Sequence, residues 1–171
     1  MKNDEILPRL VEIESKGCYS ELSSFSDPKM WKEMSRLERE LLGNLFVMQG
    51  HQLALDDVTE ALKCLRLAAK AAPSSSQVFY NIGEAYVSMG ETAKILRAAC
   101  RSFAKAVNLN PDYYEAWAAY ALTETRFGEM NKDISNFIQA DVKYQKAYEL
   151  IVKKQDANPG TLCWKWGGLW Y

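Results

Sequence analysis

Apolar side chains recur along this chain at spacings of three and four residues, and good helix formers occupy most positions between them. No stretch shows a sustained apolar and polar alternation with β-branched enrichment, which is the pattern of a half-buried strand. The pattern therefore predicts an all-α fold. Glycine, proline and capping residues divide it into helices over about 4–16, 28–48, 57–71, 76–89, 92–108, 111–127, 132–154 and 159–171.

The first part of the chain is set apart by composition. Residues 18–26 are rich in serine, and we expect them to form a linker after the first helix. Asp27 and Pro28 follow as an N-cap and a first-turn proline, which predicts that the next helix begins there. We therefore expect residues 1–26 to form an N-terminal helix with a linker, and residues 27–171 to form one array of helix pairs.

A sequence phrase in the middle of the chain recurs. Its best copy is Phe79-x-x-Ile82-Gly83-x-x-Tyr86, followed by Ala99-x-x-x-Phe103 and a late proline. This phrase resembles the tetratricopeptide repeat, whose signature is W-x2-L-G-x2-Y, then A-x3-F, then Pro. Small residues let two helices approach closely, aromatic residues fill the gaps between pairs, and proline marks the turn into the next pair.

The other copies match in part. The first has Leu42-Gly43-x-x-Phe46, but Arg39 stands where the leading aromatic belongs. The third has Trp117-x-x-Tyr120-Ala121, but Glu124 stands where an aromatic is expected. The fourth, Trp164-x-x-Gly167-Gly168-x-x-Tyr171, stops halfway through a unit.

The resemblance implies a right-handed superhelical array of antiparallel helix pairs with an extra N-terminal helix. Its units span about 36–75, 76–113 and 114–160, with a partial unit at 161–171. They exceed the family's nominal length of about 34 residues. We expect the additional residues to lengthen the second helices, and the alternative is longer loops.

The resemblance also implies that a polypeptide binds in the concave groove, which the first helices of the units line. Its surface is mixed apolar with an acidic tendency, and no cofactor is implied. By repeat position, the groove residues are Leu37, Glu40, Asn44, Val47, Met48, Gln77, Tyr80, Glu84, Val87, Glu115, Ala118, Leu122, Thr125 and Arg126.

Some tetratricopeptide relatives grip a C-terminal carboxylate with cations and asparagines. Asn44 and Asn81 match the asparagine positions, but Glu40, Glu115 and Ala119 stand where the three cations belong. An acidic groove repels a carboxylate. We therefore expect no carboxylate clamp.

Composition and charge restrict the classes of partner and the cellular compartment that we expect. The chain has 171 residues, of which 48% are apolar, and a net charge of -1, so no basic excess points to nucleic acid or an anionic membrane. No apolar run reaches the roughly 18 residues of a membrane span, and the start lacks a signal-peptide core. The cysteines Cys18, Cys64, Cys100 and Cys163 stand far apart. We expect reduced thiols in the cytoplasm rather than two disulfides.

Candidate chemistry is sparse. The single histidine, His51, follows Gly50 at an expected turn, so we interpret it as a solvated side chain rather than a catalyst or zinc ligand. Asp56 and Asp57 suit a helix cap better than a metal site. Trp117 and Trp164 stand at the core aromatic position of the repeat rather than on a nucleic-acid stacking surface. We expect no enzyme, no cofactor and no metal.

The most economical function is protein binding, as a scaffold or adaptor. A dedicated chaperone for a secretion substrate or an unassembled subunit is the alternative, and a docking subunit of an enzyme is a third class. The half unit at the end leaves apolar residues without an obvious cover. We expect this C-terminal edge to self-associate, or to be covered by a partner or further repeats. Its residues are Leu162, Trp166, Leu169 and Trp170.

Overall fold

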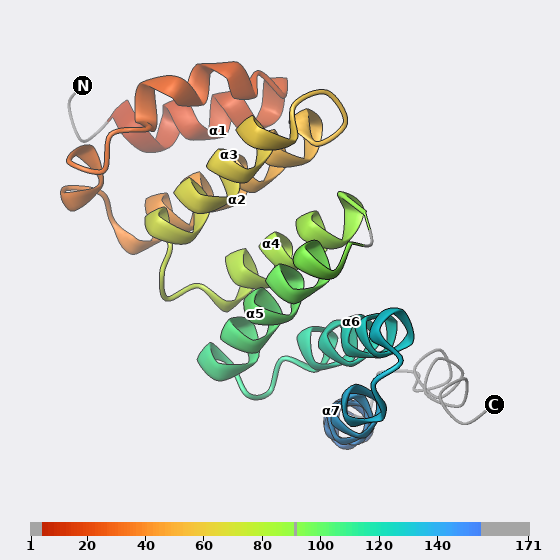
Figure 1. The fold of residues 1–171 in the computed structure, drawn as a ribbon. Coiled ribbons are helices and arrows are strands. Elements are labelled where there is room, and N and C mark those ends of the chain that lie inside the picture. The colour runs from red at the N-terminus through yellow and green to blue at the C-terminus, as the bar shows by residue number, and fades with distance from the viewer. Residues whose placement is uncertain (1–4, 91, 155–171) are drawn as a thin grey trace.

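A computed structural model of the chain describes residues 5–90 and 92–154 (Figure 1). Within these residues every regular element is a helix, which confirms the all-α prediction. The elements are α1 (Ile6–Lys16), the 3-10 helices η2 (Tyr19–Phe25) and η3 (Met30–Lys32), α2 (Arg36–Leu53), α3 (Val58–Ala71), α4 (Ser76–Ser88), α5 (Ala93–Leu109), α6 (Tyr114–Asn131) and α7 (Ile134–Lys153).

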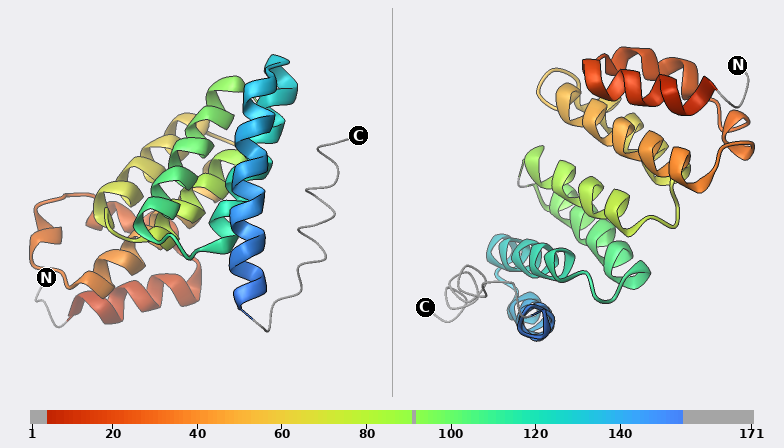
Figure 2. Two further views of the ribbon diagram at one scale, coloured as in Figure 1. Left: turned by 90° about the horizontal axis from the view of Figure 1, so that it is seen from below. Right: turned by 180° about the vertical axis from the view of Figure 1, so that it is seen from behind.

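The long helices are arranged as consecutive pairs. α2 packs along α3, α4 along α5 and α6 along α7, and the pairs follow one another from the N-terminus onward (Figures 1 and 2). Contacts of α2 with α4 and of α5 with α6 join each pair to the next. The predicted fourth unit, with Leu162, Trp166, Leu169 and Trp170, lies outside the described residues.

Small residues of the repeated phrase lie where the paired helices approach. A Cβ atom added to Gly43 would lie 3.0 Å from the Cβ of Ala72 just after α3, and one added to Gly83 would lie 2.5 Å from the Phe103 ring on α5. Because Phe103 is fully buried, its ring has no open space to enter. The repeated small residue is therefore a packing requirement of the helix pairs.

The N-terminal segment departs from the sequence prediction. Residues 18–26 do not form a free linker, because Tyr19, Leu22 and Phe25 of η2 are buried in the same core as the inner side chains of α1 and α2. Two of the serines donate to nearby backbone carbonyls, Ser24 to Glu21 and Ser26 to Ser23. The serine-rich composition thus reflects local turns rather than flexibility.

The predicted helix start at Pro28 is also wrong. Helix α2 begins at Arg36, where Ser35 and Glu38 form a reciprocal capping box in which each side chain accepts from the backbone amide of the other residue. Upstream, Trp31 is buried in η3 and its Nε1 donates to the Phe25 carbonyl at 2.7 Å. This buried indole ties residues 25–34 to the core.

The length added to the units goes to different places. In the second and third pairs the second helix is extended at its start. Helix α5 begins more than one turn before Ala99, and α7 begins more than one turn before Ala140, the alanines of the repeated phrase. The first helix is also extended in two pairs, because α2 runs past Gly50 to Leu53 and α6 runs past Gly128 to Asn131. None of the described helices is long and apolar enough to cross a bilayer.

Candidate functional site

A chain of side-chain hydrogen bonds joins the first helices of neighbouring pairs. Asn81 Nδ2 donates to Asn44 Oδ1 at 3.0 Å, and Gln77 Nε2 donates to Asn81 Oδ1 at 3.0 Å. The Tyr113 hydroxyl then donates to Gln77 Oε1 at 2.8 Å. We call these four residues the amide ladder. It holds α2 against α4 and connects α4 to the start of α6.

The amide ladder explains the two asparagines that resembled a carboxylate clamp. Asn81 donates to Asn44 across the contact between α2 and α4, so both asparagines have a packing role between these helices. A second contact farther along the same two helices places Ser88 Oγ 3.2 Å from His51 Nδ1. His51 is therefore a contact between α2 and α4, and partial burial lowers its pKa.

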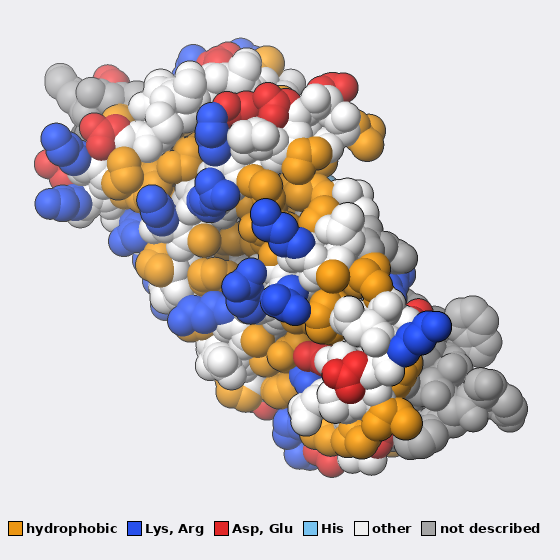
Figure 3. Space-filling model, in the orientation of Figure 1, with side chains coloured by type: hydrophobic (Ala, Val, Ile, Leu, Met, Phe, Trp, Pro, Cys, Tyr) orange, Lys and Arg blue, Asp and Glu red, His pale blue; other side chains and the backbone are white. Residues whose placement is uncertain are grey.

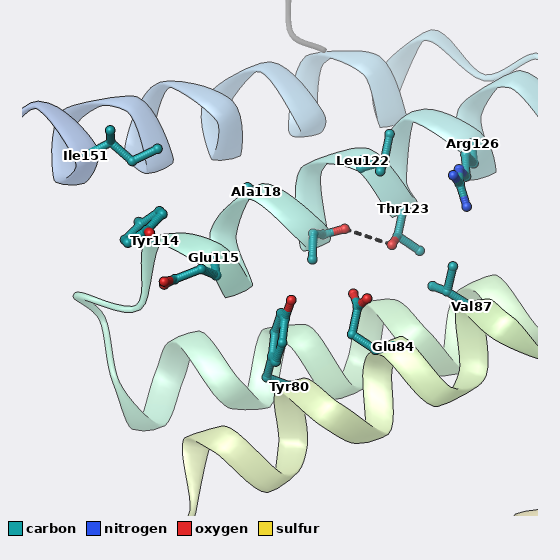
Figure 4. Close-up of a pocket in the computed structure, with 11 residues that line it drawn as sticks. Tyr80, Glu84, Val87, Tyr114, Glu115, Ala118, Leu122, Thr123, Arg126 and Ile151 are labelled. Carbon is teal, nitrogen blue, oxygen red and sulfur yellow. Dashed lines mark hydrogen bonds between the residues drawn. The ribbon is translucent and has the colours of Figure 1, made fainter. Parts of the chain in front are cut away.

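Beyond the ladder, a cleft of about 350 Å³ opens between α4 and α6, with α7 contributing at one side (Figure 4). It has apolar side chains along both helices and charged side chains among them. Its lining consists of Tyr80, Glu84, Val87, Tyr114, Glu115, Ala118, Ala119, Leu122, Thr123, Arg126 and Ile151.

Acidic groups influence the tyrosines around this cleft. Burial, then Glu84 and Glu115, raises the pKa of Tyr80. Burial also raises the pKa of Tyr113 to about 12, with smaller effects from Tyr80 and the same carboxylates. Along the cleft, Glu115 lies near the start of α6, Arg126 lies toward its end, and Glu84 on α4 lies between them (Figure 4).

Aromatic packing keeps Tyr80 in place at the cleft wall. Its ring lies 5.9 Å from the Phe103 ring and 5.2 Å from the Tyr113 ring, measured between centroids. Both pairs are tilted, which is a favourable aromatic geometry. Tyr80 is therefore a fixed wall of the cleft rather than a side chain free to reorient.

Half of the groove residues expected from the sequence line this one cleft. Seven come together here, three from α4 and four from α6: Tyr80, Glu84, Val87, Glu115, Ala118, Leu122 and Arg126. The cleft therefore combines residues that are far apart in the sequence but lie on the first helices of two successive pairs.

The remaining expected residues lie elsewhere. Val47 is only 2% exposed and belongs to the N-terminal core, so its assignment to a binding surface is wrong. Leu37 and Met48 are exposed on α2 but outside the cleft. Glu40 pairs with Arg36, with Oε1 and Nε 3.0 Å apart, and Thr125 donates to the Ala121 carbonyl. Asn44 and Gln77 belong to the amide ladder.

Sequence reasoning missed four lining residues, Tyr114, Ala119, Thr123 and Ile151. Ile151 comes from the second helix of its pair, which the repeat rule does not count as groove-lining. Tyr114 begins α6, where Lys154 Nζ lies 4.9 Å from its ring centroid. The packing of α7 against α6 brings Ile151 to the cleft, whereas Tyr114, Ala119 and Thr123 lie on α6 itself.

A buried ion pair lies between α6 and α7. Lys143 Nζ is 3.7 Å from Glu124 Oε1, and the two side chains are only 9% and 13% exposed. The Lys143 ammonium also lies 4.4 Å from the Tyr120 ring centroid and donates to the Gln139 carbonyl at 3.1 Å. Glu124, which departs from the repeat pattern, thus has a specific partner on the facing helix.

The groups around this ion pair do not form a nucleophilic site. Burial raises the pKa of Cys100 to about 12, with a further effect from Glu124, and burial raises the pKa of Tyr120 to about 12. Both side chains therefore stay protonated near neutral pH, and a protonated thiol is a poor nucleophile. We assign this cluster to packing.

Cysteines and acidic side chains are spread over the described part of the fold. Cys18, Cys64 and Cys100 are free thiols there, and Cys163 lies outside these ranges. The described residues hold no group of three or more His, Cys, Asp or Glu side chains suited to a metal ion. The cleft between α4 and α6 is therefore the leading candidate site. Neither the protein-family models nor the curated proteins give a significant match to this chain.

Proposed function

We propose that this chain is a protein-binding module of the tetratricopeptide-repeat type, acting as a scaffold or adaptor without catalysis of its own. The observation that carries the proposal is the cleft between α4 and α6, where the groove positions of two successive units converge. Consecutive helix pairs joined side to side are the arrangement that such modules use to present an extended binding surface.

The chemistry of the cleft favours a polypeptide over a small polar molecule. Val87, Ala118 and Leu122 provide apolar contact area, and Tyr80 adds a fixed aromatic wall. Glu115 and Arg126 supply charged groups toward opposite ends of the cleft, and Glu84 supplies one between them (Figure 4). A peptide that combines an apolar anchor with charged side chains matches this lining, because buried apolar anchors with a polar rim are the usual anatomy of such contacts.

A partner recovery experiment tests the proposal. The tagged chain is incubated with native lysate, and the bound proteins are quantified by mass spectrometry. The cleft variant combines Leu122→Ala with Glu84→Ala, which leaves the Tyr80 packing intact. The matched control combines Ile138→Ala with Glu149→Ala on α7, where both residues are exposed and outside the cleft.

We expect the cleft variant to lose a specific partner that the control retains. Loss of an apolar anchor and a charged contact corresponds to about 2–3 kcal/mol, which is an interaction about 30- to 150-fold weaker. A partner that is one stable subunit supports a scaffold, whereas an unfolded or secreted client supports the chaperone alternative. Equal recovery by wild type and cleft variant would show that the cleft is not the binding site.

A further inference from the structure

The described charges are strongly segregated on the fold. Seven exposed cations lie along α3 and α5, which are the second helices of the first two pairs. Helix α5 contains no Asp or Glu, and Glu60 is the acidic residue of α3. We call this surface the basic band. Its members are Lys63, Arg66, Lys70, Lys94, Arg97, Arg101 and Lys105.

Helix geometry arranges these cations in two rows. Lys94, Arg97, Arg101 and Lys105 recur every three or four residues, so they share one face of α5 over about 16 Å. Lys63, Arg66 and Lys70 do the same on α3. Figure 3 shows both rows on one side of the molecule, with acidic side chains above and below them but not between them.

Few of these cations are neutralised within the fold. Lys63 pairs with Glu60, while Arg97 lies 5.6 Å from the Phe127 ring centroid and Lys105 lies 6.0 Å from that of Phe79. Among the described residues, Arg66 and Arg101 have no acidic side chain within salt-bridge distance. A dense set of exposed like charges repels itself, and an anionic partner relieves that repulsion.

We propose that the basic band binds an acidic polypeptide segment, most simply a helix with carboxylates on one face. A carboxylate at every third or fourth position repeats at the same spacing as the rows on α3 and α5. This surface is separate from the cleft, so the inference does not depend on the proposed function of the cleft.

Two features favour an acidic peptide over nucleic acid or a membrane. The aromatic residue of α5, Phe103, is fully buried and α3 has none. The half-buried rings of Phe127 and Phe79 beside the band already lie against Arg97 and Lys105, so they are not open platforms on which bases could stack. The acidic side chains above and below the band would repel a long polyanion or an extended anionic membrane (Figure 3). A helical segment of about 11 residues matches the length of the α5 row, about 16 Å.

Fluorescence anisotropy with a defined peptide tests the inference. The probe is a labelled alanine-rich peptide of about 15 residues with four glutamates on one helical face. Two comparison peptides carry the same glutamates spread around the helix, or glutamine in their place. The band variant is Arg66→Gln with Arg101→Gln, and the matched control is Lys132→Gln with Lys153→Gln, two exposed lysines elsewhere.

We expect the band variant to bind the one-faced acidic peptide about fivefold more weakly, and the control within about twofold of wild type. Binding should weaken with added salt and disappear for the glutamine peptide. The cleft variant should bind this peptide like wild type, which separates this inference from the cleft proposal.

Three results would overturn the inference. The control variant could lose as much affinity as the band variant, which would indicate nonspecific attraction. The band variant could bind like wild type. Finally, single-stranded DNA of equal charge or phosphatidylserine vesicles could bind more tightly than the peptide, which would assign the band to another class of partner.

Discussion

The buried ion pair between Glu124 and Lys143 offers the sharpest test of the structure. Replacing Lys143 with methionine keeps most of the side-chain volume but removes the charge, which leaves the Glu124 carboxylate buried without its partner. At 3.7 Å, the gross attraction is about 4.5 kcal/mol at an effective dielectric constant of about 20. Truncating one partner of a fully buried pair costs about 3–5 kcal/mol.

The small remaining exposure of both side chains reduces this cost, while the lost cation–π contact with Tyr120 adds to it. We therefore expect Lys143→Met to lower the free energy of unfolding by about 3 kcal/mol. In a chain of this size, that corresponds to a melting temperature about 6–12 °C lower. Urea and thermal unfolding followed by circular dichroism at 222 nm measure both quantities.

A matched control lies on the same helix. Lys146 pairs with Glu149 at 3.8 Å, but both side chains are solvent-exposed, so Lys146→Met should cost about 0.5 kcal/mol or less. Glu124→Gln completes a double-mutant cycle, in which the double variant should be more stable than the sum of the single changes predicts. Equal effects of Lys143→Met and Lys146→Met, or a cycle without coupling, would refute the assignment of a stabilising ion pair.

Three further predictions follow from the packing and the pKa shifts. Gly83→Ala should lower the free energy of unfolding, measured in urea, by about 2 kcal/mol. The clash of the new methyl group with the Phe103 ring should cost the upper end of about 1–3 kcal/mol, which outweighs a helix-propensity gain of about 1 kcal/mol. A variant as stable as wild type would contradict this prediction. Brief alkylation at pH 8 followed by peptide mapping should show that the exposed Cys18 is modified well before Cys100, because burial raises the pKa of the Cys100 thiol to about 12. Equal rates of modification would be inconsistent with that burial. In the folded protein the pKa of Tyr113 and of Tyr120 is about 12, above the ordinary value of 10. As the pH rises, the unfolded chain therefore loses these two protons before the folded protein does. The free energy of unfolding should consequently fall between about pH 10 and pH 12. Tyr113→Phe should make that fall shallower, and an unchanged slope would argue against the shift.

Local signals predicted the helices well where the cap and the periodic pattern agree. Asp57, for example, accepts from the backbone amides of Thr59 and Glu60 at the start of α3, as its sequence context indicates. The same approach misplaced the start of α2, since Asp27 and Pro28 form a turn and Ser35 provides the cap. A proline signal alone does not distinguish a helix start from a tight turn.

The candidate site was only half accessible to sequence reasoning. Repeat position correctly grouped Tyr80, Glu84 and Leu122, because equivalent positions of stacked pairs face the same way. It failed for Val47, which the packing of η2 and α1 against α2 buries. It also omitted Ile151, since the contribution of α7 depends on how that helix crosses α6.

The sequence by itself determined the helical class and the paired small and aromatic positions, because helix periodicity and close approach are properties of short segments. Tertiary structure alone decided which charges are partners and which are exposed together. Glu124 was only a departure from a pattern until Lys143 of α7 was placed beside it. A net charge of -1 likewise concealed the basic band, because net charge is a sum over the chain, whereas an electrostatic surface depends on which residues the fold brings side by side.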